Sequence, residues 1–189
     1  MNALSLKTLC YMQTGLPIAR RDFDESGTMK VIQLNDLDSD GRLKPHLETV
    51  SLKRNVQQDK LIKNNDVLLK GRGTNMTATL IENAPENTIA TAAFFILRPK
   101  SHILPGFLAW YLNNNRLPVN QFATIPLLQL SNLKEMLVHL PEREVQQQII
   151  DTYKLIEEAQ ALSDRYYAKI NQLLKGVALS VQPSKEESL

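Results

Sequence analysis

Apolar residues alternating with polar ones predict several short strands in the first hundred residues. The strand-like runs are rich in β-branched and aromatic residues and are separated by Asn, Gly and Pro, which favour turns. The predicted strands are 29–34, 49–52, 67–70, 78–81 and 90–97. A sheet with irregular connections is therefore expected in this part of the chain.

Two short helices are predicted after the strands. The first begins at Pro105, a residue favoured at the first position of a helix, and ends at the three asparagines 113–115. The second has Ser131 as its N-cap and extends to Leu137, and Pro141 stops it from continuing. Both helices fall within the sheet-containing part of the chain.

The segment from 142 to about 180 predicts one long helix, because it contains no proline and a single glycine, Gly176. Apolar residues recur along it with heptad-like spacing, with imperfections at Thr152 and Ser163. At 1.5 Å per residue the helix would span roughly 55 Å, more than a small domain can cover. We therefore expect it to pair with a second long helix, from this chain or another; the alternative is a helix folded back on its own domain. The candidate pairing residues are Val145, Ile149, Ile156, Tyr166, Ile170, Leu173 and Val177.

These elements predict an α+β protein in three parts. A β-sheet-containing domain at 1–140 is followed by the long helix at 141–180 and a polar, disordered tail at 181–189. The net charge of +2 is uneven: residues 1–140 hold 16 Lys and Arg against 12 Asp and Glu, whereas the remainder holds 6 against 8. The first part is thus the one suited to face phosphate.

Composition also bounds the compartment. The single cysteine, Cys10, permits neither an intrachain disulfide nor a Cys-based zinc site, which favours a reducing cytoplasm. No apolar run approaches the roughly 18 residues that a transmembrane helix needs, so we expect no membrane association.

Motifs of common catalytic sites are missing. No Asp or Glu stands two residues before a lysine, which excludes nuclease chemistry of the PD-(D/E)xK type, and the chain has no GxxxxGK loop, GxSxG elbow, HExxH pair or amino-methyltransferase tetrapeptide. The run Asp36, Asp38, Asp40 and Gly41 imitates half of a calcium loop, but Leu47 stands where calcium requires a bidentate Glu. We expect no catalytic residue, no metal and no cofactor.

A glycine-flanked loop follows the strand predicted at 67–70. Gly71 and Gly73 let the backbone approach a partner closely, Lys70 and Arg72 carry charge suited to phosphate or a guanine edge, and Asn75 suits an adenine edge. The alternative is a polar hairpin without a ligand.

Several stretches, in this order, resemble one family. They resemble half of a DNA specificity (S) subunit of type I restriction-modification systems. The stretches are GLP at 15–17 with MKVIQL at 29–34, LIKNNDVLLKGRG at 61–73, ATAAFFILRP at 90–99, LPGFLAWYL at 104–112 and LPEREVQQQII at 140–150. Two features depart from the family: Glu142 stands where a second proline is common, and there is no internal repeat of the recognition domain and helix.

The resemblance implies a non-catalytic target recognition domain that reads half of a split DNA sequence. It also implies that the long helix is a spacer running antiparallel to a second one, which a single-copy chain would supply by homodimerisation. The implied partners are double-stranded DNA, modification (methyltransferase) subunits that methylate adenine and, in some systems, a restriction nuclease subunit.

Contacts to DNA are expected from loop side chains, chosen by their charge, amide chemistry and position rather than by the resemblance. The candidates are Arg20, Arg21, Lys70, Arg72, Asn75, Gln121 and Thr124. A twofold dimer would recognise a bipartite palindrome. Two alternatives stay open: a half-subunit that pairs with a different S-like chain, and a protein–protein adaptor without DNA specificity of its own.

Overall fold

The computed structural model describes residues 2–37, 41–53, 55–73, 76–120 and 127–180. Three of the predicted DNA contacts lie outside these ranges: Asn75, Gln121 and Thr124. The predicted tail at 181–189 lies outside them as well. Contacts divide the chain into two units, residues 1–148 and residues 149–189. We call the first unit the body and the described residues 149–177 of the second the distal helix.

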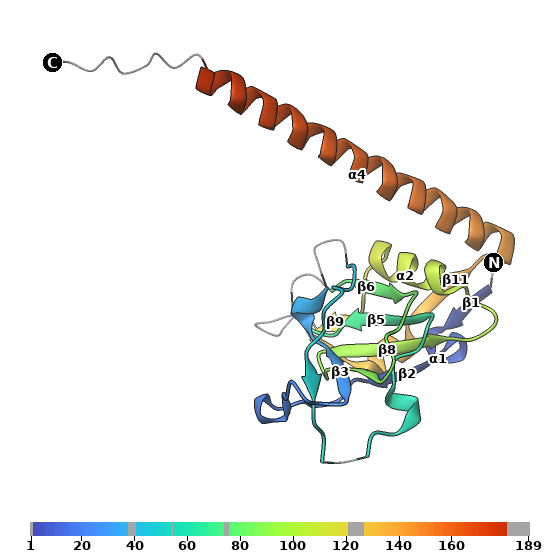
Figure 1. Cartoon of the computed structure of the whole chain (residues 1–189). Coiled ribbons are helices and arrows are strands. Elements are labelled where there is room, and N and C mark those ends of the chain that lie inside the picture. The colour runs from blue at the N-terminus through green and yellow to red at the C-terminus, as the bar shows by residue number, and fades with distance from the viewer. Residues whose placement is uncertain (1, 38–40, 54, 74–75, 121–126, 181–189) are drawn as a thin grey trace. The chain divides into compact units, whose positions relative to one another are not determined.

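A four-stranded antiparallel sheet is the centre of the body (Figure 1). Its strands lie in the order β2 (Cys10–Thr14), β8 (Phe94–Pro99), β5 (Asp66–Lys70) and β6 (Ala78–Ile81). Helix α2 (Pro105–Asn114), with Pro105 in its first turn, packs next to β6 and β5. It contributes Phe107 and Leu108, both at most 1% exposed, to the core.

A second, mixed sheet holds β4 (Thr49–Val50), β3 (Met29–Ile32) and β7 (Thr88–Ala90) in that order. Strand β3 pairs antiparallel with β4 and parallel with β7. Apolar side chains of the two sheets share one buried cluster, in which Ile32 of β3 packs with Leu68 of β5 and Ile96 of β8. Burial of these side chains joins the sheets into one body.

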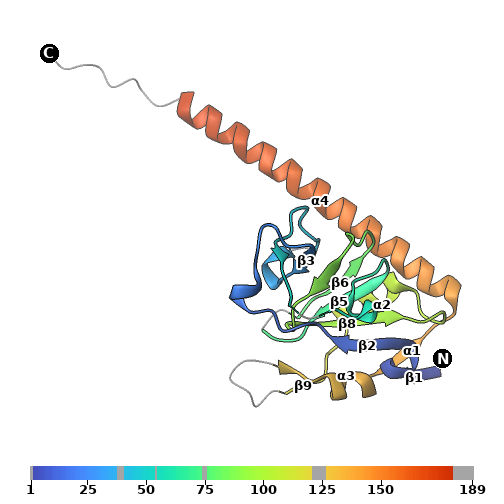
Figure 2. The ribbon, with the colours of Figure 1, turned by 60° about the horizontal axis from the view of Figure 1, so that its bottom comes forward.

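Short elements complete the body (Figure 2). Strand β1 (Asn2–Ser5) pairs antiparallel with β11 (Leu137–Leu140), so the start of the chain is bound to residues that precede the long helix. Strands β9 (Val119–Asn120) and β10 (Leu127–Leu128) pair antiparallel. The helical pieces are α1 (Leu6–Leu9), η1 (Arg20–Asp22), η2 (Leu34–Asp36), η3 (Gln58–Lys60) and α3 (Leu130–Glu135).

Three local predictions were wrong. The run at 90–97 belongs to two strands, because a turn at 91–94 separates β7 from β8: the Phe94 N–H donates to the Thr91 carbonyl at 3.0 Å, and the Ala92 N–H donates to the Leu16 carbonyl at 2.7 Å. Ser131 is not an N-cap, since α3 begins at Leu130 and its cap is Gln129, two residues before Ser131. Leu137, the predicted end of this helix, is instead the first residue of strand β11, because its backbone pairs with β1, which is far away in sequence.

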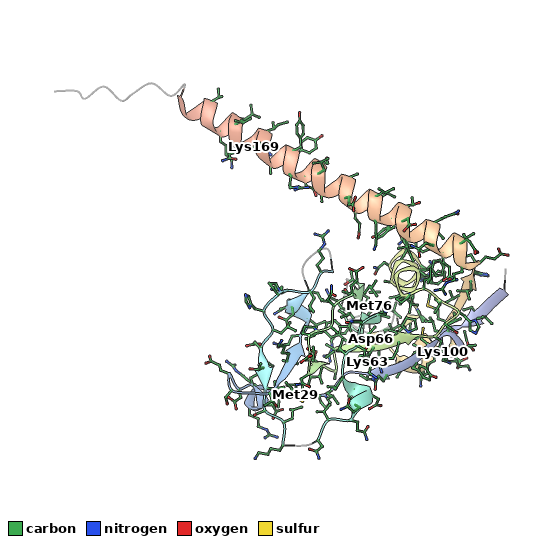
Figure 3. All side chains as sticks on the ribbon, turned by 45° about the vertical axis from the view of Figure 1, so that its right-hand side comes forward. Met29, Lys63, Asp66, Met76, Lys100 and Lys169 are labelled. Carbon is green, nitrogen blue, oxygen red and sulfur yellow. The ribbon has the colours of Figure 1, made fainter. Side chains whose placement is uncertain are left out.

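A buried ion pair joins β5 to β8. Asp66, labelled with Lys63 in Figure 3, is fully buried. Arg98 donates to its carboxylate through Nε and Nη2, each at 2.8 Å, and the Lys63 N–H donates to the same carboxylate at 2.8 Å. Hydrogen bonds to Asp66 raise the pKa of Arg98 above its ordinary value. Arg98 also donates to the Leu61 carbonyl, so this guanidinium holds the loop before β5 in place.

The long helix α4 (Arg143–Ser180) begins in the body. Gln146, in its first turn and 1% exposed, donates to the carbonyls of His102 and Pro141 and accepts the Leu104 N–H at 2.8 Å. These bonds tie the start of α4 to the residues that precede α2. Within the described part of the chain, no helix has the length and apolarity required to cross a membrane.

Candidate nucleic-acid interface

Loops that carry predicted DNA contacts leave the same end of the four-stranded sheet. The register pairs Thr14, the last residue of β2, with Phe95 and pairs Lys70, the last residue of β5, with Phe94 at the start of β8. Strand β6 starts at the same end, where Ala78 pairs with Leu69. The connections 15–28 and 71–77 therefore leave one edge of the body.

Two glycines let the backbones at this end pack closely. A Cβ at Gly15 would lie 2.2 Å from the Thr91 carbonyl oxygen, and a Cβ at Gly71 would lie 2.9 Å from the ring of Phe95. Gly71 also donates its N–H to the Ala93 carbonyl at 2.8 Å. The positions from which both loops depart are thus fixed by sterics.

Arg72 stands beside the β9–β10 hairpin. It forms an isolated antiparallel bridge with Leu127, and the Leu128 N–H donates to the Gly71 carbonyl at 2.9 Å. Leu127 in turn pairs with Asn120 of β9. The structure thereby brings residues 71–72 next to the strands that flank the predicted contact region 121–124, although the two segments are far apart in sequence.

The described candidate contacts differ in exposure. Arg20 and Arg21 are exposed on η1, and Arg72 is exposed at the start of its loop. Lys70 is half-buried at the end of β5. Arg20, Arg21 and Arg72 are therefore the described candidates best placed to reach a large ligand.

A hollow of about 770 Å³ lies next to the first of these loops. Its polar lining includes Arg21, Asp22, Ser51 and Lys53. Asp22 is already engaged, because its carboxylate accepts the Ala19 N–H at 2.8 Å. Lys53 was not among the predicted contacts. It is a basic residue directly after the strand predicted at 49–52, and this position could have indicated a contact to phosphate.

Three acidic side chains on the same loop, Asp22, Asp24 and Glu25, outnumber its two arginines. Asp24 is fully exposed, and hydrogen bonds from the hydroxyl and N–H of Ser26 hold its pKa below the ordinary value. It stays ionised at neutral pH. The 15–28 loop therefore has a net charge of −1, so attraction of phosphate depends on where Arg20 and Arg21 lie rather than on the net charge of the loop.

The helix α4 exposes a broad apolar surface. Among the predicted pairing residues, Val145, Ile156, Tyr166, Leu173 and Val177 are all at least 41% exposed, and Ile149 and Ile170 are partly exposed. Four further exposed residues were missed by the heptad pattern: Leu155, Leu162, Tyr167 and Leu174. They flank the predicted stripe and widen it. All four are large apolar residues, which could have identified them, but the strict seven-residue spacing did not include them.

Among the described residues, no group of three or more His, Cys, Asp or Glu side chains could hold a metal ion. The thiol of Cys10 is buried, and this burial raises its pKa to about 12. It is held as a neutral thiol in the core at neutral pH and is a poor nucleophile there.

Comparison with known proteins decides the family. The model of the type I restriction modification DNA specificity domain matches residues 2–172. The chain belongs to this family. The predicted resemblance is thereby confirmed, and the family's description names DNA specificity rather than a catalytic reaction.

Relatives of this specificity domain are longer proteins. The HindI type I restriction enzyme specificity subunit of Haemophilus influenzae is 26% identical over 171 residues, which are 85% of this chain and 36% of that subunit. The HsdS subunit of Thermoanaerobacter tengcongensis has a similar structure, with a TM-score of 0.66 and 16% identity over 87% of this chain and 39% of that one. A structure from a study of complex assembly in the type I R-M system gives a TM-score of 0.71 and 18% identity, over 93% of this chain and 43% of that one.

The chain thus spans about two fifths of the length of these relatives. The structural likeness shows the fold, a mixed sheet-containing domain with a long C-terminal helix. The stretch at 140–150 that carried part of the resemblance contains Gln146. In the structure this glutamine is a buried anchor of α4, so its role is to hold the helix to the body.

Proposed function

We propose that this chain is a sequence-specific DNA-binding specificity subunit, or half of one, of a type I restriction-modification complex. The body reads one half-site in the major groove and positions modification subunits, which carry out methylation; a nuclease subunit joins where the system has one. The chain itself is not catalytic, and a role on DNA places it in the cytoplasm.

The departure of the 15–28 and 71–77 loops from one end of the sheet carries this proposal. Exposed Arg20, Arg21 and Arg72 belong to these two loops. Arginine is suited both to phosphate and to bidentate contact with the major-groove edge of guanine. We assign to the same surface Lys70 and the three candidates outside the described residues, Asn75, Gln121 and Thr124.

The long helix supports a second part of the proposal, a twofold dimer. Exposed apolar side chains such as Ile156 and Leu173 need a covering surface, and a second copy of α4 running antiparallel would supply it as a coiled coil. Twofold symmetry of the protein would impose twofold symmetry on the target, giving a bipartite palindrome with an unspecified gap. In this view residues 1–140 are the reading domain and 141–180 the spacer.

The exposed helix also favours a second candidate. A different S-like chain could supply the second helix, which would make the target asymmetric. A further alternative is a protein–protein adaptor that has the helix but does not read DNA. Such an adaptor would show no salt-dependent binding to duplex DNA. Duplex binding therefore separates the adaptor from the specificity subunit.

Replacing Arg72 with Ala tests the reading surface. We measure affinity for a random-sequence duplex pool by fluorescence anisotropy at several salt concentrations, because phosphate contacts release counterions. Loss of a phosphate contact should reduce the slope of log affinity against log salt by about 1. Loss of a base contact should weaken binding by about 1–3 kcal/mol to a duplex that the wild-type chain has selected from the same pool.

The matched control is Lys63→Ala. Lys63 is exposed and precedes β5. Its replacement therefore removes the same charge as Arg72→Ala, but from the opposite end of the sheet. Its slope and affinity should stay close to wild type. Equal losses in the two variants, or no loss in either, would contradict the assignment of the reading surface; absence of any salt-dependent binding by the wild-type chain would leave the adaptor as the function.

A further inference from the structure

The side chain of Asn113, at the end of α2, binds the backbone of the first residue of β6. Its Oδ1 accepts the Ala78 N–H at 2.7 Å, and its Nδ2 donates to the Ala78 carbonyl at 2.9 Å. Strand β6 is an edge strand, so this side chain takes the place of a neighbouring strand at one residue. The contact lies where the 71–77 connection enters the sheet.

The other end of the same connection is also held. Gly71 donates to the Ala93 carbonyl, and its own carbonyl accepts the Leu128 N–H. The Lys70 N–H donates to the Thr77 carbonyl at 3.1 Å and closes the loop at its base. Exposed Arg72 therefore lies between two anchored ends, of which Asn113 holds the second through side-chain bonds.

We propose that Asn113 is a positioning residue for DNA reading: its two hydrogen bonds to Ala78 hold Thr77 in place against Lys70, next to Arg72, so that Arg72 meets the duplex in one orientation. This inference rests on the proposed function. The helix end serves as a support for the reading surface, and Asn113 itself does not touch DNA. A side chain held by its surroundings discriminates between bases better than one that must be ordered on binding.

The neighbouring asparagines provide a contrast. Asn114 donates to the Trp110 carbonyl, and Asn115 donates to the Tyr111 carbonyl, so both bind the last turn of their own helix. Of the three, Asn113 is the one whose side-chain hydrogen bonds described above reach the sheet. Asn114→Ala is therefore a matched control for Asn113→Ala, because it removes the same side chain one residue away on the same helix.

Amide hydrogen exchange of the full-length chain tests the positioning. In Asn113→Ala the Ala78 amide loses its acceptor, and exchange in peptides covering 70–78 should become about tenfold faster, while peptides of β8 keep wild-type rates. Asn113→Asp keeps the acceptor but lacks the N–H donor and should lie between the two. Asn114→Ala should match wild type in these peptides. Unchanged exchange at 70–78 in Asn113→Ala overturns the positioning.

Selection from a random duplex pool tests whether the positioning serves reading. The wild-type chain should enrich a sequence motif, and Arg72→Ala should lose enrichment at particular positions of it. Asn113→Ala should lose at least half of the enrichment at those same positions and retain it elsewhere, whereas Asn114→Ala should retain all of it.

The outcomes separate the two proposals. A wild-type chain that enriches no motif contradicts the proposed function and with it the reading role of Asn113, even where exchange becomes faster. A wild-type motif that Asn113→Ala leaves intact, or weakens equally at every position, shows a purely structural residue and overturns this inference while the proposed function stands.

Discussion

The body and the distal helix treat their large apolar residues in opposite ways. In the body Phe94 and Phe107 are at most 1% exposed, whereas Leu155 and Tyr166 on the distal helix are 66% and 65% exposed. Full burial of such a side chain stabilises a fold by about 1.5–3 kcal/mol. The body obtains this stabilisation from its own packing, whereas the exposed side chains of the distal helix do not. The body has the core of an independent fold, whereas the distal helix leaves exposed the apolar surface that the proposed pairing would cover.

The largest effect should come from charging the apolar surface of the distal helix. Replacing both Ile156 and Ile170 with Asp would bury two unpaired carboxylates from each chain in a helix pair and should weaken pairing by at least about 4 kcal/mol, roughly a thousandfold. Light scattering or analytical ultracentrifugation at micromolar concentration should then find monomer. The thermal transition of the body should be unchanged.

The matched control replaces Ala168 and Gln172 with Asp. Both residues are exposed, lie away from the predicted stripe and add the same net charge. This control should remain dimeric. A monomeric wild-type chain, or equal dissociation of both double variants, would contradict the pairing role of the stripe.

A smaller effect is expected from the buried ion pair in the body. Asp66→Ala leaves Arg98 with its main partner removed and should lower the free energy of unfolding by about 3 kcal/mol in urea titrations. Lys7→Ala, which removes an ion pair to Glu135 whose side chains are 54% and 64% exposed, should cost less than about 1 kcal/mol. Similar losses in the two variants would show that burial of Asp66 does not matter.

The smallest effect is expected where the body meets α4. Gln146→Ala removes three hydrogen bonds at a buried site and leaves the Leu104 N–H without its acceptor, which should cost about 2 kcal/mol. Gln148→Ala, at an exposed position two residues on, should be close to neutral. A neutral Gln146→Ala would mean that α4 starts without this anchor.

Regular local patterns were predictable from sequence alone. Strand β6 has the expected bounds, and α2 begins at Pro105 and ends among the asparagines, as its signals indicated. The long helix begins at Arg143, within one residue of the expected start, because nothing in this segment interrupts it. These elements depend on spacing and on helix-breaking residues near them in the chain.

Features that depend on distant partners could not be predicted. Strand β11 forms because β1 pairs with it, and the break between β7 and β8 lies where Ala92 donates its N–H to the carbonyl of Leu16, a residue far away in sequence. At the candidate interface, charge and glycine spacing pointed to Arg72, but its place beside Leu127 is a tertiary contact. The anchoring role of Asn113 was likewise hidden, since an asparagine at a helix end also suits a simple stop signal.

Selection of duplexes from a random pool by the wild-type chain and by the Ile156→Asp, Ile170→Asp double variant tests the central claim most directly. We predict that the wild-type chain enriches two inverted copies of one motif at a fixed separation, and that the double variant enriches a single copy with lower affinity. An undivided motif for the wild-type chain, or the same spaced pair from the monomeric variant, would contradict a reading body held in register by paired helices.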